Sequence, residues 1–248
     1  MIDLVVDRGV LDDFLSVLPP LSDGYVYLLS LSVRNKYLDA EERARYSLSK
    51  TEMFGRTIVK DLDDFDFYLK KLASHLEYKR TRTGLEFPVK AMVIYLMINP
   101  SSMVSAYTVF QERMNRFLQE MFRAQENGSK MNLYDMENMD HHLLTSVGKA
   151  LRRRDFIDID LDCDDEKILE EILADLHGSI CHVVKTQGGY HLLLPREQKP
   201  FPRVHEILTR VKKEHPEIKE VCFNKNAMIP LPGTLQAGKL VGFRKGGS

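Results

Sequence analysis

The first 150 residues combine two hydrophobic patterns. Short apolar runs predict buried strands at residues 25–31 and 89–98. Apolar residues at helical spacing predict helices over residues 40–60, 64–76 and 143–151. This part of the chain is therefore expected to form an α/β lobe.

The strand over residues 89–98 is expected to stop at Asn99-Pro100, because proline has no N–H group to donate to a sheet. Ser101 or Ser102 could then cap a following helix, whose apolar positions continue to Met121. A loop is expected where Asn127-Gly128 interrupts the helical pattern.

The second part of the chain has a more regular pattern. It predicts strands at residues 155–161, 179–186, 190–194 and 220–223, with helices after Asp164 or Asp165 and from Pro202, and residues 239–243 could extend the sheet. The order β-α-β-β-α-β is typical of ferredoxin-like and RNA-recognition-type (RRM) modules. Right-handed crossovers then predict the strand order 4-1-3-2, with the first and third strands adjacent.

These patterns predict an α+β fold with two lobes. Residues 1–150 would form the N-terminal α/β lobe, and residues 151–248 the RRM/ferredoxin-like lobe. The length of 248 residues and a hydrophobic content of 44% are sufficient for a large core.

Three aspartates stand at alternate positions of the first strand of the second lobe. Asp158, Asp160 and Asp162 would lie on one face, opposite apolar residues packed against helices. Neighbouring carboxylates repel each other, and a divalent cation between them removes that cost. A solvated polar strand end is the alternative. An EF-hand is excluded, because Cys163 and Leu169 stand where its glycine and glutamate are needed.

A histidine follows a glycine turn on the third strand. Strand alternation can place His191 on the same face as the aspartates. Gly188 and Gly189 would form a tight hairpin turn and let a phosphate approach the backbone, and Lys185 could supply a charge to that phosphate. The alternative interpretation is an ordinary surface or core position for the histidine and a solvated position for the lysine.

The net charge argues against a protein that holds nucleic acid through bulk charge. The chain has 35 Lys and Arg against 36 Asp and Glu, a formal net charge of -1. Local basic clusters occur at Arg34-Asn35-Lys36 and at Arg152-Arg153-Arg154, directly before the aspartate strand. Arg152 and Arg154 could contact phosphate there, although such runs are usually solvated helix ends.

Three segments together resemble the motifs of the archaeo-eukaryotic primase (AEP) superfamily, the primase-polymerase (PrimPol) group. Ile157-Asp158-Ile159-Asp160 is similar to its hydrophobic-Asp strand, and the run from Thr186 to His191 is similar to its histidine motif. Pro232-Gly233-Thr234 is similar to the loop that follows its third motif. The match covers residues 150 to 243.

The resemblance implies a metal-dependent nucleotidyltransferase that makes or extends primers on single-stranded DNA in replication. Asp158 and Asp160 would bind Mg²⁺ or Mn²⁺ ions, and His191 would contact the nucleoside triphosphate. The site for nucleotide or nucleic acid would include Thr186, Gly188, Gly189, Lys185 and Thr234, with Arg34 and Lys36 in the lobe that supports template or nucleotide. No helicase segment is present, so any unwinding partner would be a separate chain.

The third motif departs from the family, because the expected acid is replaced. Asn226 is the best-aligned position; its amide oxygen can bind a cation but adds no negative charge, and Asp162 or Glu220 could compensate. A catalytically weak or inactive AEP-like replication accessory protein that binds nucleic acid or nucleotide is therefore the second hypothesis. A metal-dependent phosphoesterase that uses the same aspartates is the third.

Composition also bears on the compartment. The three cysteines, Cys163, Cys181 and Cys222, are too scattered for a disulfide framework or a zinc site, which suits a reducing cytoplasm. The acidic N-terminus does not resemble a signal peptide. The longest uncharged stretch, residues 91–110, is interrupted by Asn99-Pro100 and is too short in its apolar part for a membrane span. A cytoplasmic protein without membrane contact is expected.

Overall fold

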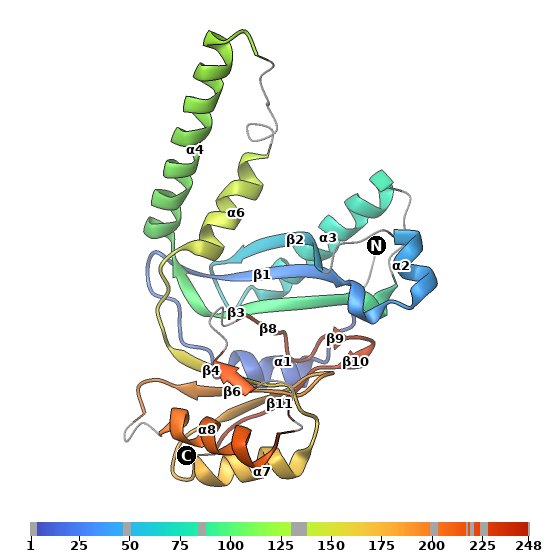
Figure 1. The fold of residues 1–248 in the computed structure, drawn as a ribbon, viewed down its shortest axis with the longest axis vertical. Coiled ribbons are helices and arrows are strands. Elements are labelled where there is room, and N and C mark those ends of the chain that lie inside the picture. Colours follow the sequence, from blue (N-terminus) through green and yellow to red (C-terminus); the bar gives the residue numbers. More distant parts are fainter. Residues whose placement is uncertain are drawn as a thin grey trace.

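The computed structural model describes residues 4–46, 51–83, 88–129, 138–198, 203–216, 218, 221–223 and 228–247. Two antiparallel sheets lie one above the other, with helices on their outer faces and between them (Figure 1). The expected α+β class is confirmed.

The first sheet is built from both ends of the chain. Its strand order is β10-β9-β3-β1-β2, and β8 also pairs with β3. The strands are β1 (Tyr25–Arg34), β2 (Thr51–Val59), β3 (Met92–Ser102), β8 (Met228–Pro230), β9 (Leu235–Gln236) and β10 (Lys239–Leu240). Three strands from beyond residue 227 therefore complete a sheet that begins at residue 25.

Helices cover both faces of the first sheet. On one face, α3 (Phe65–Thr83) packs Leu72 and Leu76 in a core shared with β1 residues such as Leu29 and Leu31. On the other, α4 (Met103–Glu126) and α6 (Met139–Lys149) pack around Leu28 of β1. Figure 1 shows α4 extending far beyond the sheet. The short helices α2 (Ala40–Tyr46), η1 (Asn35–Tyr37) and η2 (Val89–Ala91) connect these strands.

The second sheet has the order β11-β5-β6-β4-β7. Its strands are β4 (Phe156–Leu161), β5 (His182–Lys185), β6 (Tyr190–Pro195), β7 (Val221–Phe223) and β11 (Gly242–Arg244). Leaving out β11, this is the predicted 4-1-3-2 order, with β4 and β6 adjacent at the centre. The helices α7 (Glu166–Asp175) and α8 (Val204–Glu214) cover one face, packing with Ile159 and Leu161 of β4.

Helix α1 (Arg8–Leu15) joins the two sheets. Leu11 and Phe14 are fully buried in a core that also contains Val184 and Leu193 of the second sheet. The Phe14 ring meets the ring of Phe243 in β11 edge to face, with 5.3 Å between centroids. The two sheets therefore share one hydrophobic core at this end.

Three expectations for local structure need correction. The helix predicted over residues 40–60 is confirmed for α2 (Ala40–Tyr46) and wrong for β2, which carries the β-branched run Thr57-Ile58-Val59 that suits a pleated sheet. The end predicted at Asn99-Pro100 is also wrong, because β3 continues to Ser102. Pro100 is accommodated where the register with β1 shifts, and its carbonyl accepts a hydrogen bond from Arg153 N–H. The predicted strand at 239–243 is divided between the two sheets.

The two predicted caps are present. The Ser102 hydroxyl accepts a hydrogen bond from Ser105 N–H at the start of α4. The Asp165 carboxylate does the same for Lys167 N–H at the start of α7. No helix within the described ranges has the length and apolar character required to cross a membrane.

The side chain of Asn99 links β3 to the start of β4. Its Oδ1 accepts hydrogen bonds from the backbone N–H groups of Asp155 and Phe156, at 3.0 and 2.9 Å. Its Nδ2 donates to the carbonyl of Phe156 at 3.0 Å. The buried Asn99 amide therefore makes the hydrogen bonds that a neighbouring strand would otherwise make to this backbone, and it holds the start of β4 against the first sheet.

Replacing Asn99 by alanine is expected to lower the free energy of unfolding by about 1–3 kcal/mol, because three backbone groups lose their partner. Thermal unfolding followed by calorimetry should show a melting temperature several degrees lower. The control is Asn115→Ala on the exposed face of α4, expected within about 0.5 kcal/mol of the native chain. Equal losses in both variants would contradict the linking role.

Candidate functional site

Three of the predicted site residues meet on the two central strands of the second sheet. The β4–β6 register sets Asp160 opposite His191, and Asp158 lies two residues away on the same face. The Nδ1 atom of His191 is 3.1 Å from the Asp158 Oδ1 atom, and its Nε2 atom is 4.0 Å from the Asp160 Oδ1 atom. The predicted juxtaposition of these side chains is confirmed.

The three side chains differ in exposure. The carboxylate of Asp158 is fully buried, whereas the side chain of Asp160 is 45% exposed. Burial alone would lower the pKa of His191, but the hydrogen bond to Asp158 and the charges of Asp158, Asp160 and Asp162 outweigh it and raise that pKa. The imidazole is therefore held in place by Asp158 and directed towards Asp160.

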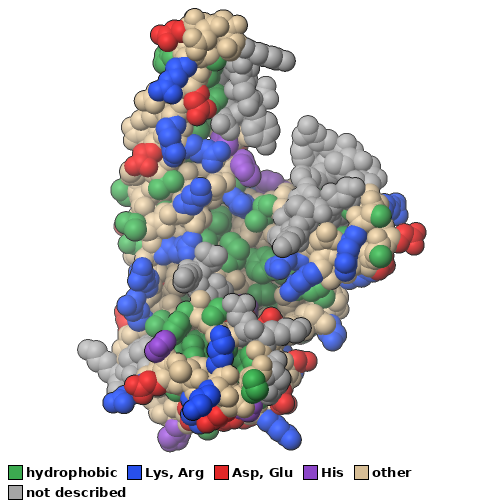
Figure 2. Space-filling model, in the orientation of Figure 1, with side chains coloured by type: hydrophobic (Ala, Val, Ile, Leu, Met, Phe, Trp, Pro, Cys, Tyr) green, Lys and Arg blue, Asp and Glu red, His purple; other side chains and the backbone are tan. Residues whose placement is uncertain are grey.

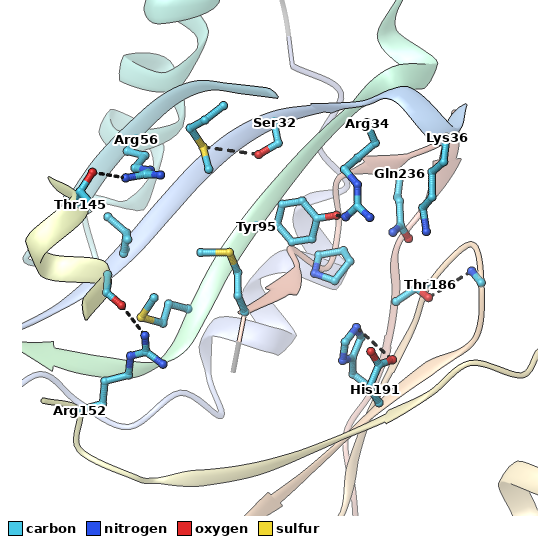
Figure 3. Close-up of a pocket in the computed structure, with 18 of the residues that line it drawn as sticks. Ser32, Arg34, Lys36, Arg56, Tyr95, Thr145, Arg152, Thr186, His191 and Gln236 are labelled. Atoms are coloured by element: carbon cyan, nitrogen blue, oxygen red, sulfur yellow. Dashed lines mark hydrogen bonds and ion pairs between the residues drawn. The ribbon is translucent and has the colours of Figure 1, made fainter. Parts of the chain in front are cut away.

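A cavity of about 600 Å³ lies between this face and the first sheet. Eight predicted site residues line it: Arg34, Lys36, Arg152, Asp160, Asp162, Thr186, Gly188 and His191. Figure 3 shows Arg34, Lys36, Tyr95 and Gln236 on the first-sheet side, facing Thr186 and His191 on the other. The fold thus joins residues that are more than 150 positions apart in the sequence.

Basic side chains predominate around the cavity. Arg34, Lys36, Arg56, Lys149 and Arg152 line it, against only the carboxylates of Asp160 and Asp162 among the described lining residues. Burial lowers the pKa of both Arg56 and Arg152. Figure 2 shows Lys and Arg side chains around a hollow with hydrophobic side chains at its floor. This distribution favours an anionic ligand with an apolar part.

Several lining residues gave no signal in the sequence. The Arg34 guanidinium donates a hydrogen bond to the hydroxyl of Tyr95 in β3. Burial raises the pKa of Tyr95, although the nearby charge of Arg34 opposes this effect. Gln236 donates to the Tyr37 hydroxyl at 2.9 Å and accepts from Gln187 N–H at 2.9 Å. It therefore ties the turn before β6 to the first sheet.

At the other end of the cavity, α6 holds two arginines. Arg56 of β2 donates to the Thr145 hydroxyl at 3.0 Å. Arg152 donates to the carbonyl of Gly148. Both contacts are drawn in Figure 3, and both direct the guanidinium groups along the cavity wall.

Other predicted site residues lie outside this cavity. Lys185 is exposed, with its ammonium group 5.5 Å from the centre of the Tyr190 ring and 3.9 Å from Asp164. Thr234 is buried, and its hydroxyl donates to the carbonyl of Leu231 three residues earlier. Gly189 lies against the backbone of Leu161. Asp158 and Arg154 line a neighbouring cavity of about 670 Å³.

The third predicted motif falls outside the described residues. Asn226, and Glu220 that could compensate for it, lie in parts of the chain that the structure does not describe. The Pro232-Gly233 part of the following loop is described: Gly233 has a φ of +81° and accepts a hydrogen bond from Asp7 N–H at 2.7 Å. This part of the loop therefore packs against the start of α1, whereas Pro230 and Gln236 on either side of it line the first cavity with Asp160.

The carboxylates have the donor chemistry that Mg²⁺ or Mn²⁺ requires. Asp160 and Asp162 both line the first cavity. Among the residues described, no three His, Cys, Asp or Glu side chains form a cluster that could hold a metal ion. Mg²⁺ is commonly held by one or two carboxylates, water and the phosphates of a substrate, rather than by a complete protein cage. The arrangement fits such a shared ion.

A scan against protein-family models and searches of curated proteins and solved structures found no significant match to this chain.

Proposed function

We propose that this chain is a primase-polymerase-like, metal-dependent nucleotidyltransferase that makes or extends primers on single-stranded DNA in replication. The observation that carries the proposal is the position of Asp160 and His191 in a cavity lined by five basic residues. Two acids and a histidine on a ferredoxin-like sheet, opposite cations on a second sheet, suit a site for a nucleoside triphosphate.

The size and lining of the cavity support this ligand class. A volume of about 600 Å³ lies within the range of roughly 300–1,000 Å³ usual for small-molecule sites. Arg34, Lys36 and Arg152 could pair with phosphates, while Met53 and Met97 offer apolar contact to a base or sugar. Asp160 and Asp162 would repel a bare triphosphate, so they indicate a ligand that arrives with divalent cations.

The residues would have separate roles. Asp160, with Asp158 and Asp162, would hold Mg²⁺ or Mn²⁺, which when bound neutralises phosphate charge and activates the attacking hydroxyl. His191 would donate a hydrogen bond to the triphosphate, in an orientation that its contact with Asp158 fixes. Arg34, itself held by Tyr95, would orient the phosphates.

Two features favour a second candidate, a non-catalytic AEP-like accessory module that binds nucleic acid or nucleotide. Asn226 stands where the family has an acid. The carboxylate of Asp158 is fully buried and already engaged by His191 at 3.1 Å, which limits its role as a metal ligand. Such a protein would bind the triphosphate without transferring it.

Extension of a labelled primer on a longer DNA template separates these functions. The native chain with Mn²⁺ and nucleoside triphosphates should extend the primer in the order that the template specifies, and a chelator should stop the reaction. Triphosphate binding without extension would favour the accessory module. Release of phosphate without extension would favour the phosphoesterase. The experiment requires no helicase, because the template is already single-stranded.

A further inference from the structure

A second cavity of about 670 Å³ adjoins the first, and Lys149 and Arg152 line both. It lies over the first half of β4, since within the described part of the chain β7 pairs with the second half, Ile159, Asp160 and Leu161. Its walls come from the end of α6, the segment that leads into β4, and Arg196 after β6. Asp158 lines this cavity, whereas Asp160 lines the first.

The second cavity is strongly basic. Lys149, Arg152, Arg154 and Arg196 line it, and Asp158 is the single acid among its described lining residues. Lys149, Arg154 and Arg196 are exposed, and none forms an ion pair with another described residue. The positive charges of these three side chains are therefore available to pair with an anionic ligand.

Arg153, next to Arg154 in the basic run, differs because its charge is already paired within the protein. Arg153 pairs with Asp155, with 2.7 Å between Nε and Oδ2, and donates to the carbonyl of Pro20 at 2.9 Å. These contacts hold the segment before β4 against Pro20, so the charge of Arg153 is already paired. Arg154, by contrast, lines the second cavity.

Apolar surface accompanies these cations. Phe223 at the end of β7 is 40% exposed, and Leu151 is 76% exposed. Both line the cavity, together with Phe156 and Ile157. Cations along a groove beside an exposed aromatic ring are what a single strand requires, with its phosphates on the cations and a base stacked on the ring.

We infer that the second cavity binds single-stranded nucleic acid, with Arg154 and Arg196 on its phosphates and Phe223 against a base. The strand would approach the Asp158 side of the paired aspartates while the triphosphate occupies the Asp160 side. That the bound strand is the acceptor in nucleotidyl transfer rests on the proposed function. That a single strand binds in this cavity does not rest on it.

Fluorescence anisotropy with a labelled oligothymidylate of about ten nucleotides tests the inference without metal or triphosphate. The double variant Arg154→Gln/Arg196→Gln should bind at least tenfold more weakly at about 0.1 M salt, and the slope of log affinity against log salt should fall by about 1.4. Phe223→Ala should weaken binding about tenfold with an unchanged slope.

The matched control is Lys212→Gln/Lys213→Gln, which removes the same charge from the exposed end of α8 on the far face of the second sheet. Its affinity and salt slope should stay within twofold of the native values. Equal losses in both double variants, no binding by the native chain, or equal binding of a polyglutamate peptide would overturn the inference. Failed primer extension with intact oligonucleotide binding would count against the proposed function alone.

Discussion

Asp160→Asn is expected to reduce primer extension roughly a thousandfold, because it removes a cation-binding charge worth about 4 kcal/mol in the transition state. Asp160 is the carboxylate of the central pair that is 45% exposed and lines the first cavity. Single-turnover extension assays with Mn²⁺ at saturating triphosphate would measure the loss. Binding of Mn²⁺, followed by electron paramagnetic resonance, should weaken in parallel.

A measurement of the free energy of unfolding distinguishes loss of primer extension at the site from unfolding of the Asp160→Asn variant. Asp160 stands among Asp158, Asp162 and His191, so removing one negative charge should change the free energy of unfolding by no more than about 0.5 kcal/mol. Asp164→Asn is the matched control, since its carboxylate is 66% exposed and lies 3.9 Å from Lys185. That variant should extend primers at the native rate. Full activity in Asp160→Asn, or equal loss in the control, would contradict the assignment.

The second sheet could be predicted from the sequence because few arrangements satisfy its pattern. Four short strands and two amphipathic helices in the order β-α-β-β-α-β, with right-handed crossovers, leave one common strand order. That order, together with strand alternation, brings His191 to the aspartates. The first sheet offered no such constraint. Residues 40–60 contain good helix formers up to Tyr46, and only pairing with β1 shows that Thr51–Val59 is a strand.

The wall opposite the aspartates was harder to predict, for a physical reason. Arg34, Tyr95 and Gln236 come from three strands whose pairing depends on contacts between distant segments. No local pattern in the sequence shows that Gln236 binds the Tyr37 hydroxyl, or that Tyr95 lies beside Arg34. Conversely, Thr234 was predicted from its motif, but its loop is held against α1 by the backbone contact of Gly233 with Asp7.

Gly189→Ala is expected to lower the free energy of unfolding by about 2–4 kcal/mol, through backbone strain and a steric clash. Gly189 has a φ of +155°, and a Cβ atom there would lie 2.0 Å from the Leu161 carbonyl oxygen and 2.8 Å from the Cys163 nitrogen. The alanine would therefore push the turn away from the end of β4. Denaturant unfolding should show a lower midpoint, and His191 should lose its register with Asp160.

Gly188→Ala provides the control within the same turn. Its φ is not in the positive region, and its Cβ atom would lie 3.4 Å from the Asp162 Oδ1 atom, close to ordinary contact. Its stability should stay within about 0.5 kcal/mol of the native chain, or rise slightly because alanine restricts the unfolded state. Equal destabilisation by both alanines would show that the turn needs glycine for general flexibility. The expected difference assigns Gly189 to packing against β4 and leaves Gly188 as the glycine that borders the first cavity.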